Sequence, residues 1–425
     1  MSPPRASLVV IGEVVVEASP DGLQTAEAVG IADGRVVSVG TWQDVLDKAA
    51  TRATVIDAGA AAVVPGLHDF HLHLVGMANA RLEVRLDDVV TFPELVDRVR
   101  HAATSTPSDA WLRGRGWVEA AVDHAALSSL ERAVGERPTL LYSHDGHSAW
   151  ASRAALRLAG ISAGTPDPAG GRIERDAAGG PTGILRERAT DLVEPVAGRT
   201  DPAQLGRSLD ETVAELLGWG VTGATDAGDS SPDNGIGAYA AIGDSGSTLL
   251  DAHDRLDGRL RLTVNLPAAA IDAGAELGLR TGLPIAGAST LRAGWAKAYA
   301  DGALGSRTAA LFEPYSCGDE RQLGILRLEA DDLDRLLAAG RATGIGLAVH
   351  AIGDRASAAV LDGIERSPAR GLGVPPDRIE HLQLMRPSDY PRLAALDVTA
   401  SMQPIHAASD RELVERCWQP RQADA

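Results

Sequence analysis

Two histidines separated by a single residue, His71 and His73, follow an apolar run and a Pro-Gly pair. If this segment is a β-strand, both imidazoles point to the same face, because side chains two residues apart share a face. Imidazole is a common zinc ligand, and two ligands from one strand end leave coordination positions open for water. The spacing alone also suits two packed core histidines, so the predicted metal site needs further ligands.

Two more histidines lie at or near the ends of apolar segments, His350 in GLAVHAIGD and His381 in RIEHLQL. Barrel enzymes place their chemistry at the carboxyl ends of the strands. Either histidine alone could have a structural role. Together with the first pair, both are predicted to be metal ligands.

A lysine in GWAKAYADG, Lys297, is one of only two lysines among 40 basic residues, the other being Lys48. Alternation along the segment directs its side chain into the predicted barrel, where an ammonium is costly to bury. A deprotonated amine, unlike a guanidinium, can react with CO₂ to form a carbamate that bridges two metal ions. The alternative is an ion pair with Asp226 or Asp301.

Seven apolar segments separated by helix-length stretches predict an α/β fold, a (β/α)8-type TIM barrel with seven recognisable strands. Helical periodicity is clearest over residues 204–220 and 330–344. The strand segments are residues 61–73, 221–228, 259–267, 291–302, 345–354, 378–385 and 398–406.

The predicted domains are a small N-terminal β module, residues 1–64, and a barrel domain, residues 65–425. The module contains a hairpin turn at Asp33-Gly34. The barrel carries an insertion at about residues 76–200 that could cover a site at the strand ends. Only a short charged helix and a tail follow residue 406, so the final strand is expected to be missing.

The formal charge of −18 disfavours nucleic acids and anionic membranes as partners and favours a small-molecule substrate. No signal peptide or membrane span is expected. The two cysteines, Cys317 and Cys417, lie far apart in the sequence, which excludes a disulfide framework and suits the cytoplasm. An open barrel edge would permit a homo-oligomer.

Several stretches resemble the amidohydrolase superfamily, and within it the amidohydrolase family 3 branch that includes N-substituted formamide deformylases. This resemblance implies a (β/α)8 barrel beside a β-sandwich built from both chain ends. It also implies one or two divalent metal ions, expected to be zinc, bound by His71, His73, Lys297 as a carbamate, His350 and His381. The matching stretches are ADGRVVSVG, VVPGLHDFHLHL, DGHSAW, PTGILRERA, KAYADGALGSRTAALF, VHAIGDRA, IEHLQ and SMQPIHAASD.

Four residues are candidates for substrate binding. Asp145 and His147 match a family segment expected to line the substrate pocket, although a simple loop contact is the alternative. Arg307 would anchor a polar substrate group unless it forms a salt bridge, and His406 would face the barrel mouth.

In such a site the metal lowers the pKa of bound water, yielding a hydroxide, and polarises the attacked carbonyl. The expected reaction is hydrolysis of a non-peptide C–N bond in a small N-acyl or N-formyl compound, with Lys297, His350 and His381 as catalytic candidates. A Gly-Ser-Asp motif, which supplies a further Asp in the family, is not found, and Asp410 is expected to belong to a helix. The alternatives are a truncated, catalytically impaired metal-binding remnant, and a hydrolase of an ester, lactone or deaminated ring.

Overall fold

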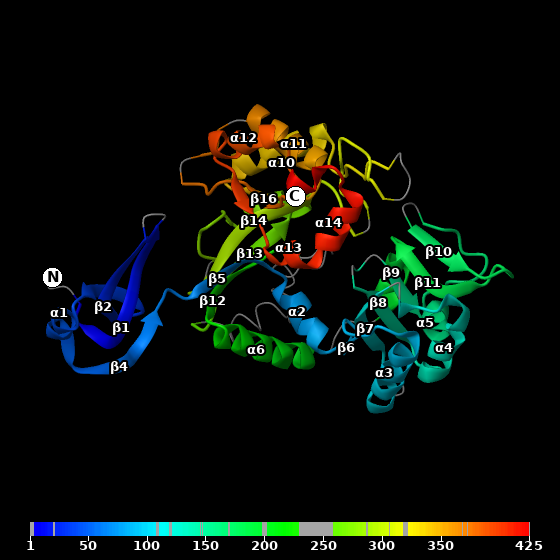
Figure 1. Ribbon diagram of the computed structural model, residues 1–425, viewed down its shortest axis with the longest axis horizontal. Coiled ribbons are helices and arrows are strands. Elements are labelled where there is room, and N and C mark those ends of the chain that lie inside the picture. The colour runs from blue at the N-terminus through cyan, green and yellow to red at the C-terminus, as the bar shows by residue number, and fades with distance from the viewer. Residues whose placement is uncertain are drawn as a thin grey trace. The chain divides into compact units, whose positions relative to one another are not determined.

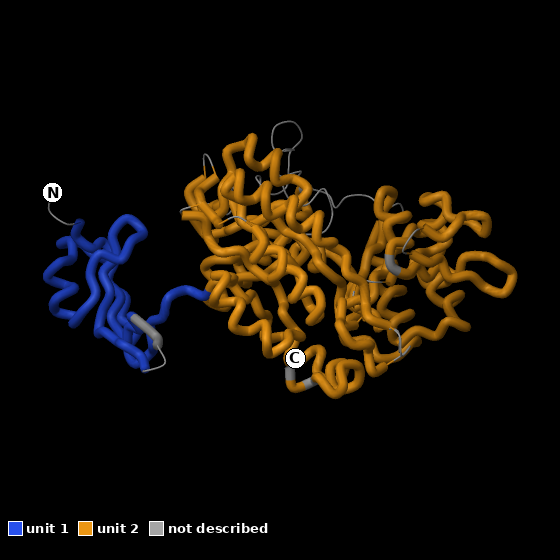
Figure 2. Tube along the Cα trace, turned by 90° about the horizontal axis from the view of Figure 1, so that it is seen from above, with its two compact units in different colours: residues 1–67 blue, residues 68–425 orange. Residues whose placement is uncertain are grey.

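The computed structural model divides into two compact units, Met1–Leu67 and His68–Ala425, which Figure 2 colours separately. Each unit is described by itself below. The described residues are 4–19, 22–107, 110–118, 121–144, 146, 148–168, 171–197, 202–228, 258–285, 288–305, 307–317, 322–367, 369–371 and 373–424.

The first unit contains a four-stranded sheet in the order β3-β2-β1-β4 and a short helix, α1. Asp33 and Gly34 both have positive φ angles, as the hairpin turn predicted between β2 and β3 requires. The described residues form one sheet rather than two facing sheets, so the expected sandwich is not confirmed. The elements are β1 (Ala6–Ser19), β2 (Gly22–Ala32), β3 (Arg35–Gly40), α1 (Trp42–Asp47) and β4 (Ala49–Val63).

The second unit is built on a seven-stranded sheet in the order β17-β16-β15-β14-β13-β12-β5 (Figure 1). Neighbouring strands from β12 to β17 are parallel. Each strand lies within one of the seven predicted segments, which confirms the barrel-like α/β sheet. The strands are β5 (Leu67–Leu72), β12 (Val221–Asp226), β13 (Arg261–Pro267), β14 (Leu291–Tyr299), β15 (Leu347–Ala351), β16 (Arg378–His381) and β17 (Thr399–Ser401).

Several helices pack against this sheet through apolar residues that share one core with the strands. In α10, Leu333 and Leu337 are buried, and Gly344 ends the helix with a left-handed conformation that glycine adopts at little cost. This apolar layer fixes the strands and therefore the residues at their ends. The helices are α2 (Leu74–Arg81), α6 (Pro202–Gly218), α9 (Ile271–Glu276), α10 (Ala330–Thr343), α11 (Asp354–Arg366), α12 (Tyr390–Ala395), α13 (Ile405–Ser409) and α14 (Arg411–Cys417).

Residues between β5 and α6 form a second sheet, six-stranded, in the order β10-β11-β9-β8-β7-β6. Trp117 and Trp150 are buried in its apolar core. Its elements are β6 (Val84–Arg85), α3 (Phe92–Ser105), β7 (Leu112–Trp117), α4 (Ser128–Val134), β8 (Thr139–Ser143), β9 (Ser148–Ala151), α5 (Arg153–Leu158), β10 (Gly171–Arg175) and β11 (Pro181–Glu187).

The outer strands of the seven-stranded sheet, β5 and β17, are connected by one side chain of β16. Nη2 of Arg378 donates to the carbonyl oxygen of Phe70 and to Oγ of Ser401, each at 2.7 Å. The guanidinium is buried, and its Cζ lies 4.8 Å from the centroid of the Trp295 ring. One buried cation therefore links strands that are not neighbours in the sheet.

The two cysteines form a disulfide, Cys317–Cys417, across a sequence separation of 100 residues. The expectation that the two cysteines form no disulfide is therefore wrong, and their separation in the sequence no longer supports a reducing cytoplasm. The bond attaches α14 to the loop that follows β14. None of the described helices is long and apolar enough to cross a membrane.

Candidate metal centre

Four of the five predicted metal ligands form a contiguous cluster of imidazoles. His71 lies in β5 and His73 directly after it, whereas His350 and His381 lie near the carboxyl ends of β15 and β16. The ring centroids are 5.5 Å apart for His71 and His73, 4.8 Å for His71 and His381, and 4.6 Å for His350 and His381. Strands far apart in sequence thus place these side chains in contact.

The first histidine of the cluster has a fixed orientation. Nδ1 of His71 lies 2.7 Å from Oε2 of Glu380, and its backbone amide donates to Oδ1 of Asp69 at 2.9 Å. Burial lowers the pKa of His71, although the hydrogen bond to Glu380 opposes the shift. His71 is therefore a neutral imidazole with one nitrogen engaged.

The backbone of His381 explains why it joins the cluster. Adjacent residues of a strand normally point to opposite faces, yet Glu380 and His381 both contact His71. His381 has a φ of 77° and Leu382 a φ of 49°, a left-handed conformation that is unfavourable for both residue types. Such strain is concentrated at functional sites.

The same residue carries a buried nitrogen without a hydrogen bond. Within the described part of the chain, Nδ1 of His381 has no hydrogen-bond partner. Burial, followed by the charges of His350, His71 and Lys297, strongly lowers its pKa. A neutral imidazole nitrogen without a protein partner is available to a metal ion.

The backbone that follows His350 at the end of β15 is held by an acidic residue, Asp301. Nε2 of His350 donates to the carbonyl oxygen of Gly302 at 3.0 Å, and burial lowers the pKa of His350 to about 3. Asp301 accepts hydrogen bonds from the amides of Ala310, Ile352 and Gly353. Burial raises the pKa of this carboxyl to about 7.

The lysine predicted to form a carbamate is buried, as expected. Its Nζ lies 5.0 Å from the centroid of the Tyr299 ring, and Asp301, one of its expected partners, binds backbone amides instead. Burial lowers the pKa of Lys297 to about 8, with Glu380 opposing and Arg378 assisting the shift. A substantial neutral fraction at physiological pH is the form that reacts with CO₂.

A fifth histidine extends the cluster from α13. The rings of His406 and His381 have centroids 5.4 Å apart. Nδ1 of His406 lies 3.1 Å from Oδ2 of Asp410, which also accepts a hydrogen bond from Gln383 at 2.6 Å. Asp410 lies between α13 and α14 rather than inside the expected helix. It orients His406 through this hydrogen bond.

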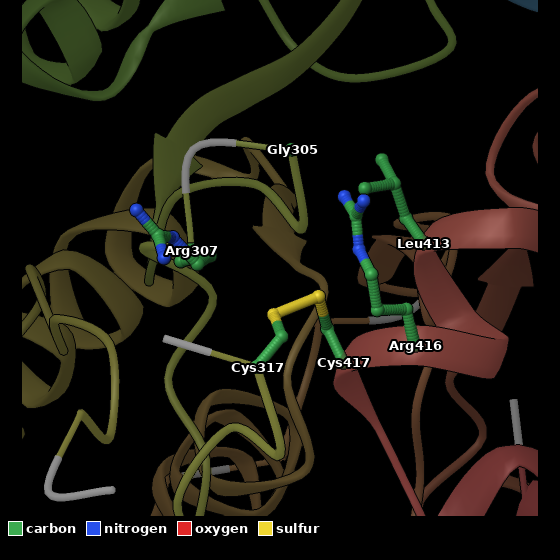
Figure 3. A pocket seen from close by; sticks show the side chains of 6 residues that line it. All are labelled: Gly305, Arg307, Cys317, Leu413, Arg416 and Cys417. Carbon is green, nitrogen blue, oxygen red and sulfur yellow. A yellow bond between two sulfur atoms is a disulfide. The ribbon is translucent and has the colours of Figure 1, made fainter. Parts of the chain in front are cut away.

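The structure describes one further substrate-binding candidate, Arg307. Arg307 lines a cavity of about 330 Å³ beside the disulfide, as Figure 3 shows, and no histidine is among its described lining residues. Asp145 and His147 lie outside the described residues. The cavity is lined by Gly305, Arg307, Cys317, Leu413, Arg416 and Cys417.

The donor set fits a divalent metal ion in its chemistry. The described residues contain no group of three His, Cys, Asp or Glu side chains already in metal-binding geometry. The cluster nevertheless offers neutral imidazoles, a buried unpartnered nitrogen on His381 and a lysine with a lowered pKa. His71, His73, His350 and His381 with Lys297 are the residues that would hold the ion.

Sequence analysis missed the two charged residues that organise His71. Arg378 and Glu380 are buried and share a face of β16, because they are two residues apart. Two ionisable side chains at this spacing in an apolar strand were a detectable signal, since such groups are rarely buried without partners.

The parallel barrel sheet, with a histidine cluster at its strand ends, is the arrangement of a metal-dependent hydrolase. The profile described as "Amidohydrolase family" matches residues 54–425, and the chain belongs to this family. The resemblance found in the sequence is thereby confirmed.

Relatives of known sequence or structure agree with this assignment. YtcJ of Bacillus subtilis (strain 168), designated an amidohydrolase, is 31% identical over 388 residues, which cover 90% of this chain and 70% of YtcJ. An N-substituted formamide deformylase of Arthrobacter pascens is 31% identical over 211 residues, 48% of this chain and 39% of that enzyme. An uncharacterized metal-dependent hydrolase from Pyrococcus furiosus matches with a TM-score of 0.74 at 26% identity, covering 98% of this chain and 81% of that one.

Proposed function

We propose that this protein hydrolyses a non-peptide C–N bond of a small N-acyl or N-formyl compound with one or two divalent metal ions, zinc being the expected metal. The observation that carries the proposal is the contact between imidazoles of β5, β15 and β16 beside a buried lysine. The formamide deformylase, which matches about half of the chain, supports the choice of bond.

A divalent ion at this site would supply an activated water and polarise the carbonyl under attack. The protein's own groups prepare the site. Burial keeps the His350 and His381 rings neutral, so each ring has one nitrogen that can donate an electron pair at neutral pH. Lys297, as a carbamate, would replace a buried cation by an anion suited to bridge two metal ions.

Two parts of the chain are proposed to bind the substrate. His406 contacts His381 and is held by Asp410, which places it beside the reacting groups. Arg307, together with Asp145 and His147, would recognise polar substituents. A small molecule, rather than a nucleic acid or a membrane, suits the charge of −18. Cytoplasmic location, a homo-oligomer and closure into a complete (β/α)8 barrel remain predictions.

The proposal is tested with the full 425-residue chain loaded with zinc or cobalt. N-formyl and N-acetyl amines are offered beside matched esters and lactones, and amine or acid release is followed. We expect turnover of the amides that is abolished by His381→Asn and unchanged by His101→Asn, which alters an exposed residue of α3.

Other outcomes distinguish the competing functions. Turnover of esters or lactones alone would replace the proposed bond specificity. Stoichiometric metal binding without turnover of any class would identify an impaired metal-binding remnant. A chain that binds no metal would overturn the proposal.

A further inference from the structure

Glu380 is the only carboxylate with a hydrogen bond to an imidazole nitrogen of His71 in the described part of the chain. Oε2 of Glu380 and Nδ1 of His71 are 2.7 Å apart, and the side chains are 1% and 10% exposed. The partners lie on different strands, β16 and β5, which are not neighbours in the sheet. Little solvent reaches this hydrogen bond, so its geometry sets the orientation of the His71 ring.

The chemistry of the pair determines which nitrogen carries the proton. Oε1 of Glu380 lies 3.0 Å from Nε of Arg378, whose guanidinium is always charged, so Glu380 is the ionised member of a buried ion pair. An ionised carboxylate only accepts hydrogen bonds, so Nδ1 of His71 must be the donor. A neutral His71 then has an unprotonated Nε2, the nitrogen that can bind a metal ion.

Glu380 is itself immobilised by the second missed residue. Nε of Arg378 lies 3.0 Å from Oε1 of Glu380. The same guanidinium donates to the carbonyl oxygen of Phe70, the residue directly before His71, and lies over the Trp295 ring. Arg378 therefore fixes both the carboxylate and the backbone next to the histidine that the carboxylate orients.

We propose that Glu380 is a positioning residue that holds His71 with the proton on Nδ1 and presents Nε2 to the metal ion, with Arg378 fixing the carboxylate. This inference rests on the proposed metal site. Removing a carboxylate that orients a ligating histidine typically lowers metal affinity by about 10–100-fold. We expect a loss of about that size.

The test uses Glu380→Gln, nearly identical in shape, and Glu380→Ala, in the full chain. Glu365→Gln is the matched control, because Glu365 forms an exposed ion pair with Arg392. Cobalt is titrated while its visible absorption reports ligand geometry. In the metal-free chain, ¹⁵N signals of labelled histidines report the tautomer, and His71→Gln assigns the signal. Circular dichroism shows that each variant is folded.

Both Glu380 variants should raise the dissociation constant for cobalt by about 10–100-fold, whereas Glu365→Gln should not. Wild-type His71 should carry its proton on Nδ1, and Glu380→Ala should lose that preference. Unchanged affinity in both variants, or a proton on Nε2 in the wild type, would overturn the inference while the metal site stands. A wild-type chain that binds no cobalt would overturn the metal site as well.

Discussion

The imidazoles of His350 and His381 lie edge to face, with ring centroids 4.6 Å apart and an interplanar angle of 69°. They belong to adjacent parallel strands, and burial lowers the pKa of each. The positive charge of one protonated ring would be repelled by the positive charge of the other. This cluster is therefore organised to stay neutral, which is the state that binds metal ions.

The first prediction concerns the pH dependence of stability in the metal-free chain. Between its folded-state pKa of about 3 and the ordinary histidine pKa of 6.5, His350 binds a proton only after unfolding, so its contribution to stability falls as pH decreases. Asp301 acts in the opposite direction, because its pKa is raised to about 7. Comparison with a His350→Asn variant separates the two effects.

Urea unfolding at pH 7 and pH 5 provides the measurement. The wild type should lose about 2 kcal/mol more than His350→Asn over this range. Equal losses in both proteins would show that His350 is protonated in the folded chain at pH 5.

The second prediction concerns Lys297, whose burial as a cation destabilises the metal-free chain. Its folded-state pKa is about 8, below the ordinary lysine pKa of 10.5, so the penalty is present below pH 8 and disappears as pH rises toward 10.5. In CO₂-free buffer, Lys297→Met should raise the unfolding free energy at pH 7 by about 3 kcal/mol. The gain should vanish near pH 10.5.

The only other lysine provides the control. Lys48 is exposed, so Lys48→Met should leave both stability and metal binding unchanged. With ¹³C-labelled bicarbonate and zinc, the wild type and Lys48→Met should show one carbamate resonance that Lys297→Met lacks. A resonance retained in Lys297→Met would place the carbamate elsewhere.

The third prediction concerns Asp301. Its two oxygens accept hydrogen bonds from three backbone amides, Ala310 in one loop and the consecutive Ile352 and Gly353 in another. Asparagine offers one acceptor oxygen and directs an NH₂ group at the remaining amide hydrogens. Asp301→Asn should therefore lower the unfolding free energy by about 1–3 kcal/mol, measured by urea unfolding. Amide exchange at Ala310 and Gly353 should accelerate, whereas Asp334→Asn, which alters a half-exposed carboxylate beside Arg366, should match the wild type.

Several strands were predictable from apolar runs typical of buried parallel strands, as in Leu347–Ala351. The histidines of the cluster were predictable for the same reason, since each lies near the end of such a run. In the sheet these strands are ordered β17-β16-β15-β14-β13-β12-β5.

Other features depend on contacts that a linear pattern does not contain. Glu380 and His71 are 309 residues apart, and their hydrogen bond exists only after β5 and β16 are placed. The positive φ of His381 reverses the alternation that would have directed its ring away from the cluster. The sandwich was expected from the resemblance rather than from residue patterns, and no further strand was predicted after residue 406.

The last prediction concerns Cys317 and Cys417, the only cysteines of the chain, which the structure joins in a disulfide. A thiol assay of the unfolded, unreduced protein should find no free thiol, whereas two per chain would contradict the pairing. Because the bond closes a separation of 100 residues, it restricts the unfolded chain strongly. Its removal by Cys317→Ser with Cys417→Ser should lower the unfolding free energy by about 4 kcal/mol. The chain has seven tryptophans, among them the buried Trp418 beside α14, so tryptophan fluorescence during urea unfolding with and without reductant measures the loss. The double variant should no longer respond to reductant, which separates the disulfide from other effects of the reducing agent.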